Sequence, residues 1–254
     1  MRLKGKIGVV TGGGAGIGRG IVLAFAREGA DVAVLDINLE AAAKTAKDAE
    51  ASGVRALPLE LDVAAGEAVE KAVKRVLERF GKIDILVNNA GISPKRQGMK
   101  VPVVEMDPAE WDRVIAVNLR GTFLCSRAVL PSMMERKYGK IVNMSSVAGK
   151  TGGFAGGAHY ASSKAAILAL TKAIAHEAAP YGINVNAVMP SRIKSDMGFS
   201  IPESKLKERL AQIPLGRLGT PEDVAEAVLF LACDQTSSWI TGATLNVSGG
   251  ALMD

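Results

Sequence analysis

Ser146, Tyr160 and Lys164 are the three residues whose types and spacing could support acid/base chemistry. Tyr160 and Lys164 lie four positions apart in segment 159–181, whose apolar residues recur at helical spacing, so their side chains share one helix face. A free phenol has a pKa of about 10, and an ammonium group one turn away favours the phenolate. We therefore predict that Lys164 lowers the pKa of Tyr160, so that the phenol acts as acid or base near neutral pH.

Ser146 follows a short apolar run, 141–144, that predicts a buried strand. Its hydroxyl can donate a hydrogen bond to an oxygen that becomes negative during a reaction. A Tyr and a Lys at this spacing also occur by chance on many helices. The chemical interpretation therefore depends on the elements that would position the three side chains.

A glycine-rich turn follows the first predicted strand, 7–10, and leads into a predicted helix over 17–28. Its glycines have the spacing G-x-x-x-G-x-G, at Gly12, Gly16 and Gly18. Small residues let the backbone approach a pyrophosphate, and the helix N-terminus presents free N–H groups and the positive end of its dipole. We therefore predict a dinucleotide site here, to which Gly14 and Ile17 also belong.

Asp36 ends the second predicted strand, 31–35, and is 18 residues after Gly18. A carboxylate at this point accepts hydrogen bonds from both ribose hydroxyls of an adenosine and repels a 2′-phosphate. The position therefore favours NAD(H) over NADP(H) as cofactor. The alternative is that Asp36 is only the N-cap of the helix that follows.

Length and composition limit the class of protein. The 254 residues are 48% hydrophobic, but no apolar run approaches the roughly 18 residues of a membrane span. The net charge is +5, yet acidic and basic residues alternate and aromatics make up only 4%, so nucleic-acid binding is not expected. His159 and His176 are too far apart to suggest a metal site. With no signal peptide in view and two cysteines in helical patterns, Cys125 and Cys233, we expect a soluble protein of the reducing cytoplasm.

Apolar β-like runs alternate with longer helical patterns from end to end, which predicts an α/β fold with a parallel sheet covered on both faces. Without a linker or repeat, we expect one domain over residues 1–254. The predicted strands are 7–10, 31–35, 56–61, 83–87, 141–144, 183–188 and 243–247. The predicted helices are 17–28, 39–52, 67–80, 108–136, 159–181, 203–211 and 221–233.

Several motifs together resemble one family over essentially the whole chain. They are TGGGAGIG at 11–18, Asp62-Val63, NNAG at 88–91, Asn118, the Ser146, Tyr160 and Lys164 set, and the segment from Pro190. They occur in the order seen in short-chain dehydrogenases/reductases. The resemblance implies a Rossmann-type, doubly wound fold with a seven-stranded parallel sheet and helices on both faces, usually assembled as a homotetramer.

The resemblance also implies a role for each motif. Tyr160 would be the acid/base, and Lys164 both its electrostatic partner and a ribose ligand. Ser146 would polarise a carbonyl, and Asn118 would hold a proton-relay water, unless it only kinks its helix. The other cofactor contacts would be Asp62 and Val63 at the adenine, Asn89, Ala90 and Gly91 in the cleft, and Pro190, Ile193 and Ser195 at the nicotinamide. The NNAG turn could instead merely cap a strand.

Three positions depart from the family pattern. Ser146 is 14 residues before Tyr160, where 13 is usual, so Ser145 is a rival for the carbonyl contact. The usual Pro-Gly is Pro190-Ser191 here, which leaves the backbone shape of that turn open. Where relatives that use NADPH often carry a basic residue, position 15 is alanine, and this agrees with NAD.

Together these features predict reversible hydride transfer between NAD and a small-molecule alcohol or ketone. The expected substrate is a secondary alcohol of polyol, sugar or hydroxyacyl type. The alternative is a 3-oxoacyl-thioester reductase on acyl carrier protein or CoA; such relatives usually use NADPH, which fits Asp36 poorly. A nucleotide-binding protein without turnover is a third interpretation, which the complete Ser-Tyr-Lys set argues against.

Two further regions leave alternatives open. Lys95, Arg96 and Lys100, in loop 92–106, favour an anionic substrate unless they are simply solvated. Near the C-terminus, Trp239, Leu252 and Met253 belong either to a subunit interface or to the core of the monomer.

Overall fold

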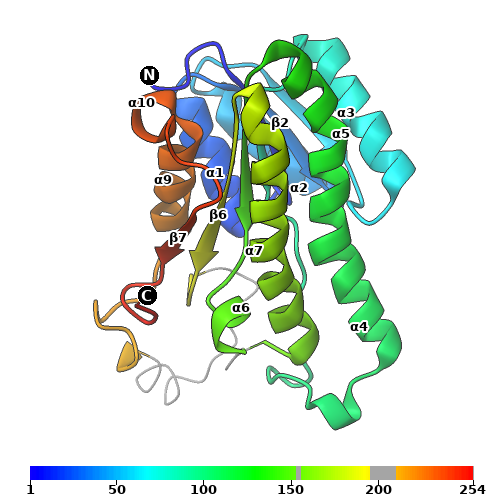
Figure 1. The fold of residues 1–254 in the computed structure, drawn as a ribbon, viewed down its shortest axis with the longest axis vertical. Coiled ribbons are helices and arrows are strands. Elements are labelled where there is room, and N and C mark those ends of the chain that lie inside the picture. The colour runs from blue at the N-terminus through cyan, green and yellow to red at the C-terminus, as the bar shows by residue number, and fades with distance from the viewer. Residues whose placement is uncertain (153–155, 195–209, 254) are drawn as a thin grey trace.

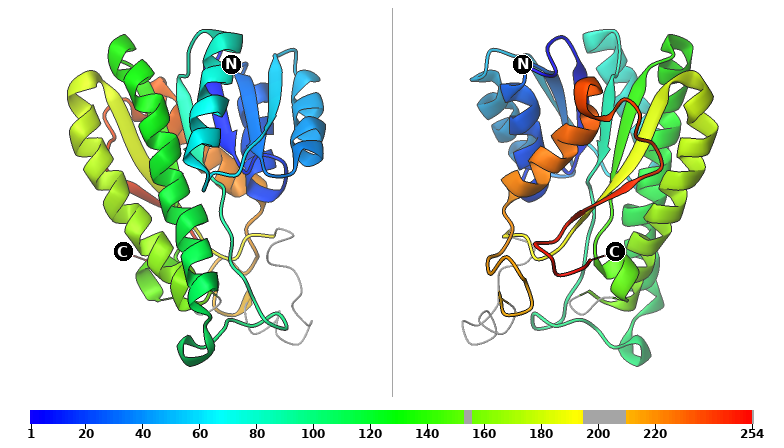
Figure 2. Two further views of the ribbon diagram at one scale, coloured as in Figure 1. Left: turned by 90° about the vertical axis from the view of Figure 1, so that its right-hand side faces the viewer. Right: turned by 60° about the vertical axis from the view of Figure 1, so that its left-hand side comes forward.

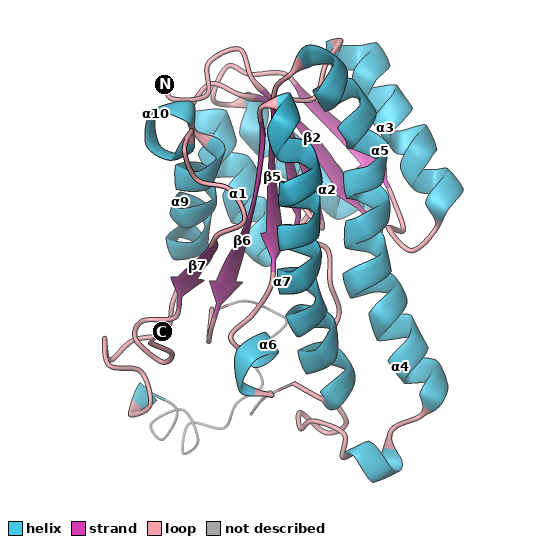
Figure 3. Ribbon diagram, in the orientation of Figure 1, coloured by secondary structure: helices cyan, strands magenta, loops and turns pink. Residues whose placement is uncertain are grey.

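The computed structural model describes residues 1–152, 156–194 and 210–253. These residues form a seven-stranded sheet with the order β3-β2-β1-β4-β5-β6-β7, in which every pair of neighbours is parallel (Figures 1 and 3). The strands are β1 (Ile7–Thr11), β2 (Asp31–Asp36), β3 (Ala56–Glu60), β4 (Ile85–Asn88), β5 (Gly139–Met144), β6 (Ile183–Pro190) and β7 (Thr244–Val247). The predicted doubly wound fold is confirmed, and the strand ends shift only slightly.

Helices cover both faces of the sheet, as the alternating pattern predicts (Figure 2). One face carries α1 (Gly16–Arg27), α2 (Leu39–Glu50) and α9 (Pro221–Ala232), and the other carries α3 (Gly66–Phe80), α5 (Gly121–Arg136) and α7 (Ala158–Ala178). Each layer has its own core: Phe25 and Val228 pack on the first face, and Val76 and Val129 on the second. Because both faces are covered, β1 and β5 are buried at every position.

The predicted helix over 108–136 is divided into three pieces. It consists of α4 (Pro108–Ile115), a π-helical turn η2 (Ala116–Arg120) and α5. A π turn inserts an extra residue into the helical ladder, and such turns are frequent at functional sites. Asn118 lies in this turn, which interrupts the regular α-helical hydrogen bonding between α4 and α5.

Smaller elements complete the described chain. They are η1 (Val103–Glu105), α6 (Ala148–Thr151), η3 (Ala179–Tyr181) and α10 (Asp234–Ser237). The predicted helix over 203–211 lies almost entirely outside the described residues. In the part of the chain that is described, no helix is long and apolar enough to span a bilayer. Trp239 is 99% exposed and Met253 75% exposed, so neither belongs to the core of the monomer, while Leu252 is half-buried.

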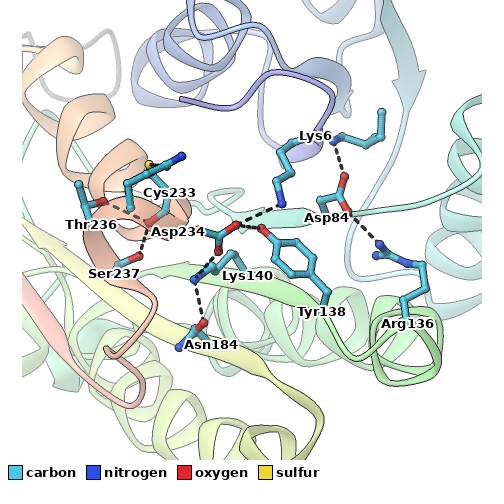
Figure 4. Close-up of polar contacts among 12 residues, drawn as sticks. Lys6, Asp84, Arg136, Tyr138, Lys140, Asn184, Cys233, Asp234, Thr236 and Ser237 are labelled. Carbon is cyan, nitrogen blue, oxygen red and sulfur yellow. Dashed lines mark hydrogen bonds and ion pairs between the residues drawn. The ribbon is translucent and has the colours of Figure 1, made fainter. Parts of the chain in front are cut away.

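A cluster of charged and aromatic side chains lies at the amino-terminal edge of the sheet (Figure 4). Asp234 accepts a hydrogen bond from the Tyr138 hydroxyl at 2.9 Å. The same carboxylate pairs with Lys140 Nζ at 3.1 Å and with Lys6 Nζ at 3.2 Å. Lys140, which is 2% exposed, also donates to Asn184 Oδ1 at 2.8 Å. A buried lysine is therefore matched by acceptors on two sides.

Asp84, at 1% exposure, is the second buried charge at this edge. It accepts from the Ile7 backbone N–H at 2.9 Å and pairs with Lys82 and Arg136, each at 2.9 Å. Arg136 also donates to the Ile83 carbonyl. The sequence analysis did not anticipate this cluster, because its members are far apart along the chain. The signal that could have found it is a charged residue, Lys140, inside an apolar strand.

Candidate active site

The carboxyl ends of the strands open into a pocket with a volume of about 640 Å³. This is the edge at which α/β sheets bind ligands, near the point where the strand order reverses between β1 and β4. The predicted site residues that line it are Gly12, Gly16, Ile17, Gly18, Asp36, Asp62, Val63, Asn89, Ala90, Gly91, Ser146, Tyr160, Lys164, Pro190 and Ile193. Gly14 and Asn118 lie behind the pocket wall, and Ser195 lies outside the described residues.

The glycine turn after β1 is tightly packed. Gly12 has a φ of +61°, and a Cβ on it would lie 2.9 Å from the Ala90 Cα. A Cβ on Gly18 would lie only 2.0 Å from the Gly12 carbonyl oxygen. Helix α1 then begins with no side-chain cap and no acidic residue in its first turn, so its N–H groups are left for an anion. The turn fits the pyrophosphate of a dinucleotide.

The NNAG segment after β4 is bound to this turn. Asn89 donates through Nδ2 to the carbonyls of Thr11 and Gly12, at 3.0 and 2.9 Å. The backbone N–H groups of Asn89 and Ala90 donate to Thr11 Oγ1, at 3.0 and 3.1 Å. The segment therefore does more than cap a strand. Thr11 was missed in the sequence analysis, although a hydroxyl at the end of an apolar strand was a usable signal.

Asp36 stands in the pocket wall at the end of β2, and its carboxylate accepts from the backbone N–H groups of Gly14 at 2.9 Å and Asn38 at 3.0 Å. It is not the cap of α2, because that cap is Asn38, whose side chain accepts from Ala41 N–H. The Gly14 N–H donates to Asp36, so Gly14 contributes to the conformation of the turn without lining the pocket.

Asp62 and Val63 lie beyond β3, on the same side of the pocket. Asp62 Oδ2 is 3.3 Å from Arg113 Nη2 of α4, and its Oδ1 accepts from Ala64 N–H at 2.9 Å. Val63 is 6% exposed and packs against Gly121, whose Cβ would lie 2.7 Å from it. Arg113 also lines the pocket, and nothing in the sequence pattern pointed to it.

Tyr160, Ser146 and Lys164 come together in the pocket wall as expected, but their electrostatics differ from the prediction. Burial raises the pKa of Tyr160, and the hydrogen bond with Ser146 opposes this rise. The predicted lowering by Lys164 is wrong for the protein alone, because burial outweighs it; Lys164 Nζ donates to the Met144 carbonyl at 2.6 Å and is 5.6 Å from the centre of the phenol ring. Burial lowers the pKa of Lys164 to about 8. The phenol is therefore protonated at neutral pH, which suits a proton donor.

The two candidate serines have different surroundings. Ser145 Oγ donates to the Lys164 carbonyl at 2.7 Å, and the residue is 4% exposed. Ser146 accepts from Ala148 N–H at 3.2 Å and bonds to Tyr160. Ser146 is therefore the serine whose hydroxyl stands beside the phenol.

Asn118 is fully buried and joins three elements. Its Oδ1 accepts from Ile92 N–H at 2.8 Å, and its Nδ2 donates to the Ile92 carbonyl at 3.0 Å and to Ser163 Oγ at 3.1 Å. A Cβ on Gly91 would lie 3.3 Å from Asn118 Oδ1 and 3.6 Å from Lys164 Nζ. The amide and the ammonium therefore face the same glycine of the cleft.

The segment after β6 is held by a backbone hydrogen bond to β7. Ser191 N–H donates to the Val247 carbonyl at 3.1 Å, and Arg192, the next residue, has a φ of +50°. Ile193 then forms a bridge with Gly219. In the loop after β4, Lys95 lines the pocket, whereas Arg96 and Lys100 are exposed.

Comparisons with known proteins agree with the fold described above. A family model described as enoyl-(acyl carrier protein) reductase matches residues 12–251. With this match, the fold and the Ser-Tyr-Lys set, the chain belongs to the short-chain dehydrogenase/reductase family. It is an oxidoreductase that acts on a hydroxyl or keto group.

Several similar proteins have names that include acyl carrier protein or CoA. The chain is 42% identical to 3-oxoacyl-[acyl-carrier-protein] reductase FabG of Thermotoga maritima, with all of both chains covered. It is 40% identical to the (2S)-[(R)-hydroxy(phenyl)methyl]succinyl-CoA dehydrogenase subunit BbsD of Thauera aromatica, with 98% of each covered. A crystal structure of a 3-oxoacyl-[acyl-carrier protein] reductase with bound NAD from Brucella melitensis has a TM-score of 0.91 at 41% identity, covering 100% of this chain and 95% of that one.

Proposed function

We propose that the protein interconverts 3-oxoacyl thioesters and 3-hydroxyacyl thioesters, with NAD(H) as the preferred cofactor. The relatives favour this function over one on a polyol or sugar alcohol, since FabG of T. maritima and BbsD of T. aromatica are both named for reactions on acyl thioesters. Ser146, Tyr160 and Lys164 in one pocket wall support turnover rather than binding alone.

Asp36 is the observation that carries the cofactor preference. Its carboxylate lies in the pocket wall, and the neighbouring Ile37 and Asn38 bring no cation that could neutralise a 2′-phosphate. Two like charges placed together cost several kcal/mol in binding, so NADPH should bind less well than NADH. The crystal structure of the Brucella reductase holds NAD, which supports the binding of this cofactor.

Some pocket residues would hold the cofactor, and others would hold the substrate and transfer the proton. The glycine turn and α1 would hold the pyrophosphate, Asp36 the adenosine ribose, and Lys164 the other ribose. When bound, the nicotinamide supplies or accepts the hydride. The hydroxyls of Ser146 and Tyr160 would hold the substrate's carbonyl oxygen, and Tyr160 would give its proton to that oxygen during reduction and take it back during oxidation.

Steady-state assays with NADH and NADPH in parallel test the proposal. The substrates are acetoacetyl-CoA, the same acyl group on acyl carrier protein, and a neutral ketone without a thioester. We expect a thioester to be reduced fastest, and NADH to exceed NADPH in kcat/KM by about tenfold or more, because of the Asp36 charge. Comparing the rates with the two thioesters shows whether the protein prefers CoA or acyl carrier protein as the carrier of the acyl group.

Asp36→Asn is the matched variant, because its amide oxygen can still accept from the Gly14 N–H while the charge is removed. Its NADH-to-NADPH ratio should fall toward one. Asp48→Asn, on the exposed side chain that pairs with Arg19, is the control and should keep the wild-type ratio. A wild-type preference for NADPH, or a faster reaction with the neutral ketone, would contradict the proposal.

We further propose that the protein assembles as a homotetramer of the kind that the family resemblance implies. The exposed aromatic side chains of Trp239, Phe230 and Phe123 support an interface with other copies. Sedimentation equilibrium measures the mass in solution, and a monomer at micromolar concentration would contradict the assembly.

A further inference from the structure

His159, the residue before Tyr160, lies in the first turn of α7 and has no exposed surface. Its Nδ1 accepts the backbone N–H of Tyr160 at 2.7 Å. Its other ring nitrogen, Nε2, is 3.1 Å from Oε1 of Glu110 on α4. Both ring nitrogens are therefore engaged, one by the residue proposed to carry the proton and the other by a carboxylate.

These contacts define the tautomer of the imidazole. A backbone N–H can only donate, so Nδ1 must carry a lone pair rather than a proton. The ring proton is then on Nε2, and it points to the Glu110 carboxylate, which accepts it. Glu110 thus selects the one neutral tautomer of His159 that can accept from Tyr160.

The Tyr160 N–H needs such an acceptor because of its place in the helix. The first backbone bond of α7 runs from Ala161 N–H to the Gly157 carbonyl at 3.0 Å, so the N–H groups before Ala161 have no partner within the helix. Gly157 is the N-cap and offers no side chain. His159 supplies the missing acceptor from within the turn.

The imidazole packs closely against Gly157, near Met106. A Cβ on Gly157 would lie 2.7 Å from His159 Cε1 and 3.3 Å from the methyl carbon of Met106. Met106 closes the loop that begins at Ile92, and α4 with Glu110 follows it. The first turn of α7 is thereby tied to the end of the loop 92–106.

We infer that His159 and Glu110 are positioning residues for Tyr160, with His159 holding the backbone of the tyrosine and Glu110 holding the tautomer of His159. The inference rests on the proposed role of Tyr160 as proton carrier. It assigns neither residue a contact with substrate or cofactor. Their loss should therefore lower kcat while leaving binding unchanged.

His159→Leu tests this inference, because leucine fills the site but accepts no hydrogen bond. We expect kcat for acetoacetyl-CoA reduction to fall by about tenfold or more, since small displacements of a reacting group cost up to about 100-fold. The Kd for NADH and the KM for the thioester should stay near wild-type values. His176→Leu makes the same change at an exposed histidine of the same helix and should leave kcat unchanged.

His159→Asn keeps the inference testable if the leucine variant folds poorly. The asparagine Oδ1 takes the place of Nδ1 and can accept from Tyr160, although it cannot reach Glu110. We expect kcat to recover most of the loss, with a melting temperature no higher than that of His159→Leu. Glu110→Gln, which still accepts from Nε2–H, should retain more activity than Glu110→Leu.

The outcomes separate this inference from the proposed function. If the wild-type protein does not reduce thioesters with NADH, the proposed function fails. If the wild type is active and His159→Leu keeps its kcat, or if His159→Asn loses as much kcat as His159→Leu, the positioning role is wrong. A rise in the Kd for NADH that accounts for the whole loss would also overturn it.

Discussion

The two ends of the sheet use the same residue types for opposite purposes. The amino-terminal edge has Tyr138 and Lys140 around Asp234, and the carboxyl edge has Tyr160 and Lys164 beside Ser146 (Figure 4 shows the first set). At the first edge each cation meets a carboxylate. At the second, no carboxylate pairs with Lys164 among the described residues, and the polar groups face a pocket.

The difference is visible in the pKa shifts. Burial raises the pKa of both tyrosines, but Asp234 adds to the rise at Tyr138, while the hydrogen bond with Ser146 opposes it at Tyr160. Burial also opposes the charge of Asp234, yet hydrogen bonds from Tyr138, Lys140 and Lys6 together keep its pKa below the ordinary value. Removing one partner of a matched buried pair is costly, and a charge without a counter-charge beside a pocket is available for chemistry.

Lys164→Met should have the largest effect. The uncharged side chain can neither hold the ribose proposed for Lys164 nor supply an ammonium at the wall of the pocket, so kcat/KM should fall by roughly 10²–10⁴-fold. NADH oxidation with acetoacetyl-CoA measures the loss. Lys172→Met changes an exposed lysine of the same helix and should keep wild-type activity. Equal activity in Lys164→Met and Lys172→Met would mean that Lys164 has no catalytic role at the carboxyl edge of the sheet.

Asp84→Ala should have the largest effect at the amino-terminal edge. The variant leaves Arg136 and the Ile7 N–H without their buried acceptor, and breaking such a pair costs about 3–5 kcal/mol. Urea unfolding measures the free energy of unfolding. Asp48→Ala, in an exposed pair with Arg19, should cost about 1 kcal/mol or less. If Asp84→Ala lowers the free energy of unfolding by no more than Asp48→Ala does, this network does not stabilise the fold.

The pH dependence of reduction should show a smaller change. Since burial lowers the pKa of Lys164 to about 8, its ammonium is lost as the pH rises through that value. We expect kcat/KM to decrease above a pH of about 8, approaching roughly tenfold per unit. Lys164→Arg stays charged and should lose this alkaline limb, though at a lower rate overall. If the arginine variant shows the same decrease of kcat/KM above a pH of about 8, the group that titrates is not Lys164.

The sequence predicted the fold and most of the site because both follow from local patterns. Apolar runs that end in Asp36, Asn88 or Ser146 place polar residues at one edge of a parallel sheet, and the glycine spacing marks the turn. The edge places both Ser145 and Ser146 at the pocket, and the structure shows that Ser146 is the one bonded to Tyr160.

Other features could not be read from local patterns. Whether Asp36 or Asn38 caps α2 depends on which side chain reaches the first N–H groups. The spacing of two residues reveals neither the burial that sets the direction of the Tyr160 pKa nor the hydrogen bond from Lys164 to the Met144 carbonyl. The contact between His159 and Glu110 joins α7 to α4, which are separated along the chain by η2, α5, β5 and α6, so only the tertiary structure brings the two residues together.

The central claim is that the carboxyl edge of the sheet carries out the chemistry, whereas the amino-terminal edge stabilises the fold. Replacing one tyrosine by phenylalanine at each edge tests this claim most directly. Tyr160→Phe and Tyr138→Phe each remove a single hydroxyl, and turnover of acetoacetyl-CoA, the Kd for NADH and the melting temperature are measured for both. We expect Tyr160→Phe to bind NADH and melt like the wild type but to lose turnover, and Tyr138→Phe to keep turnover but melt at a lower temperature, because Asp234 loses a hydrogen bond. Near wild-type turnover in Tyr160→Phe with NADH bound would contradict the account.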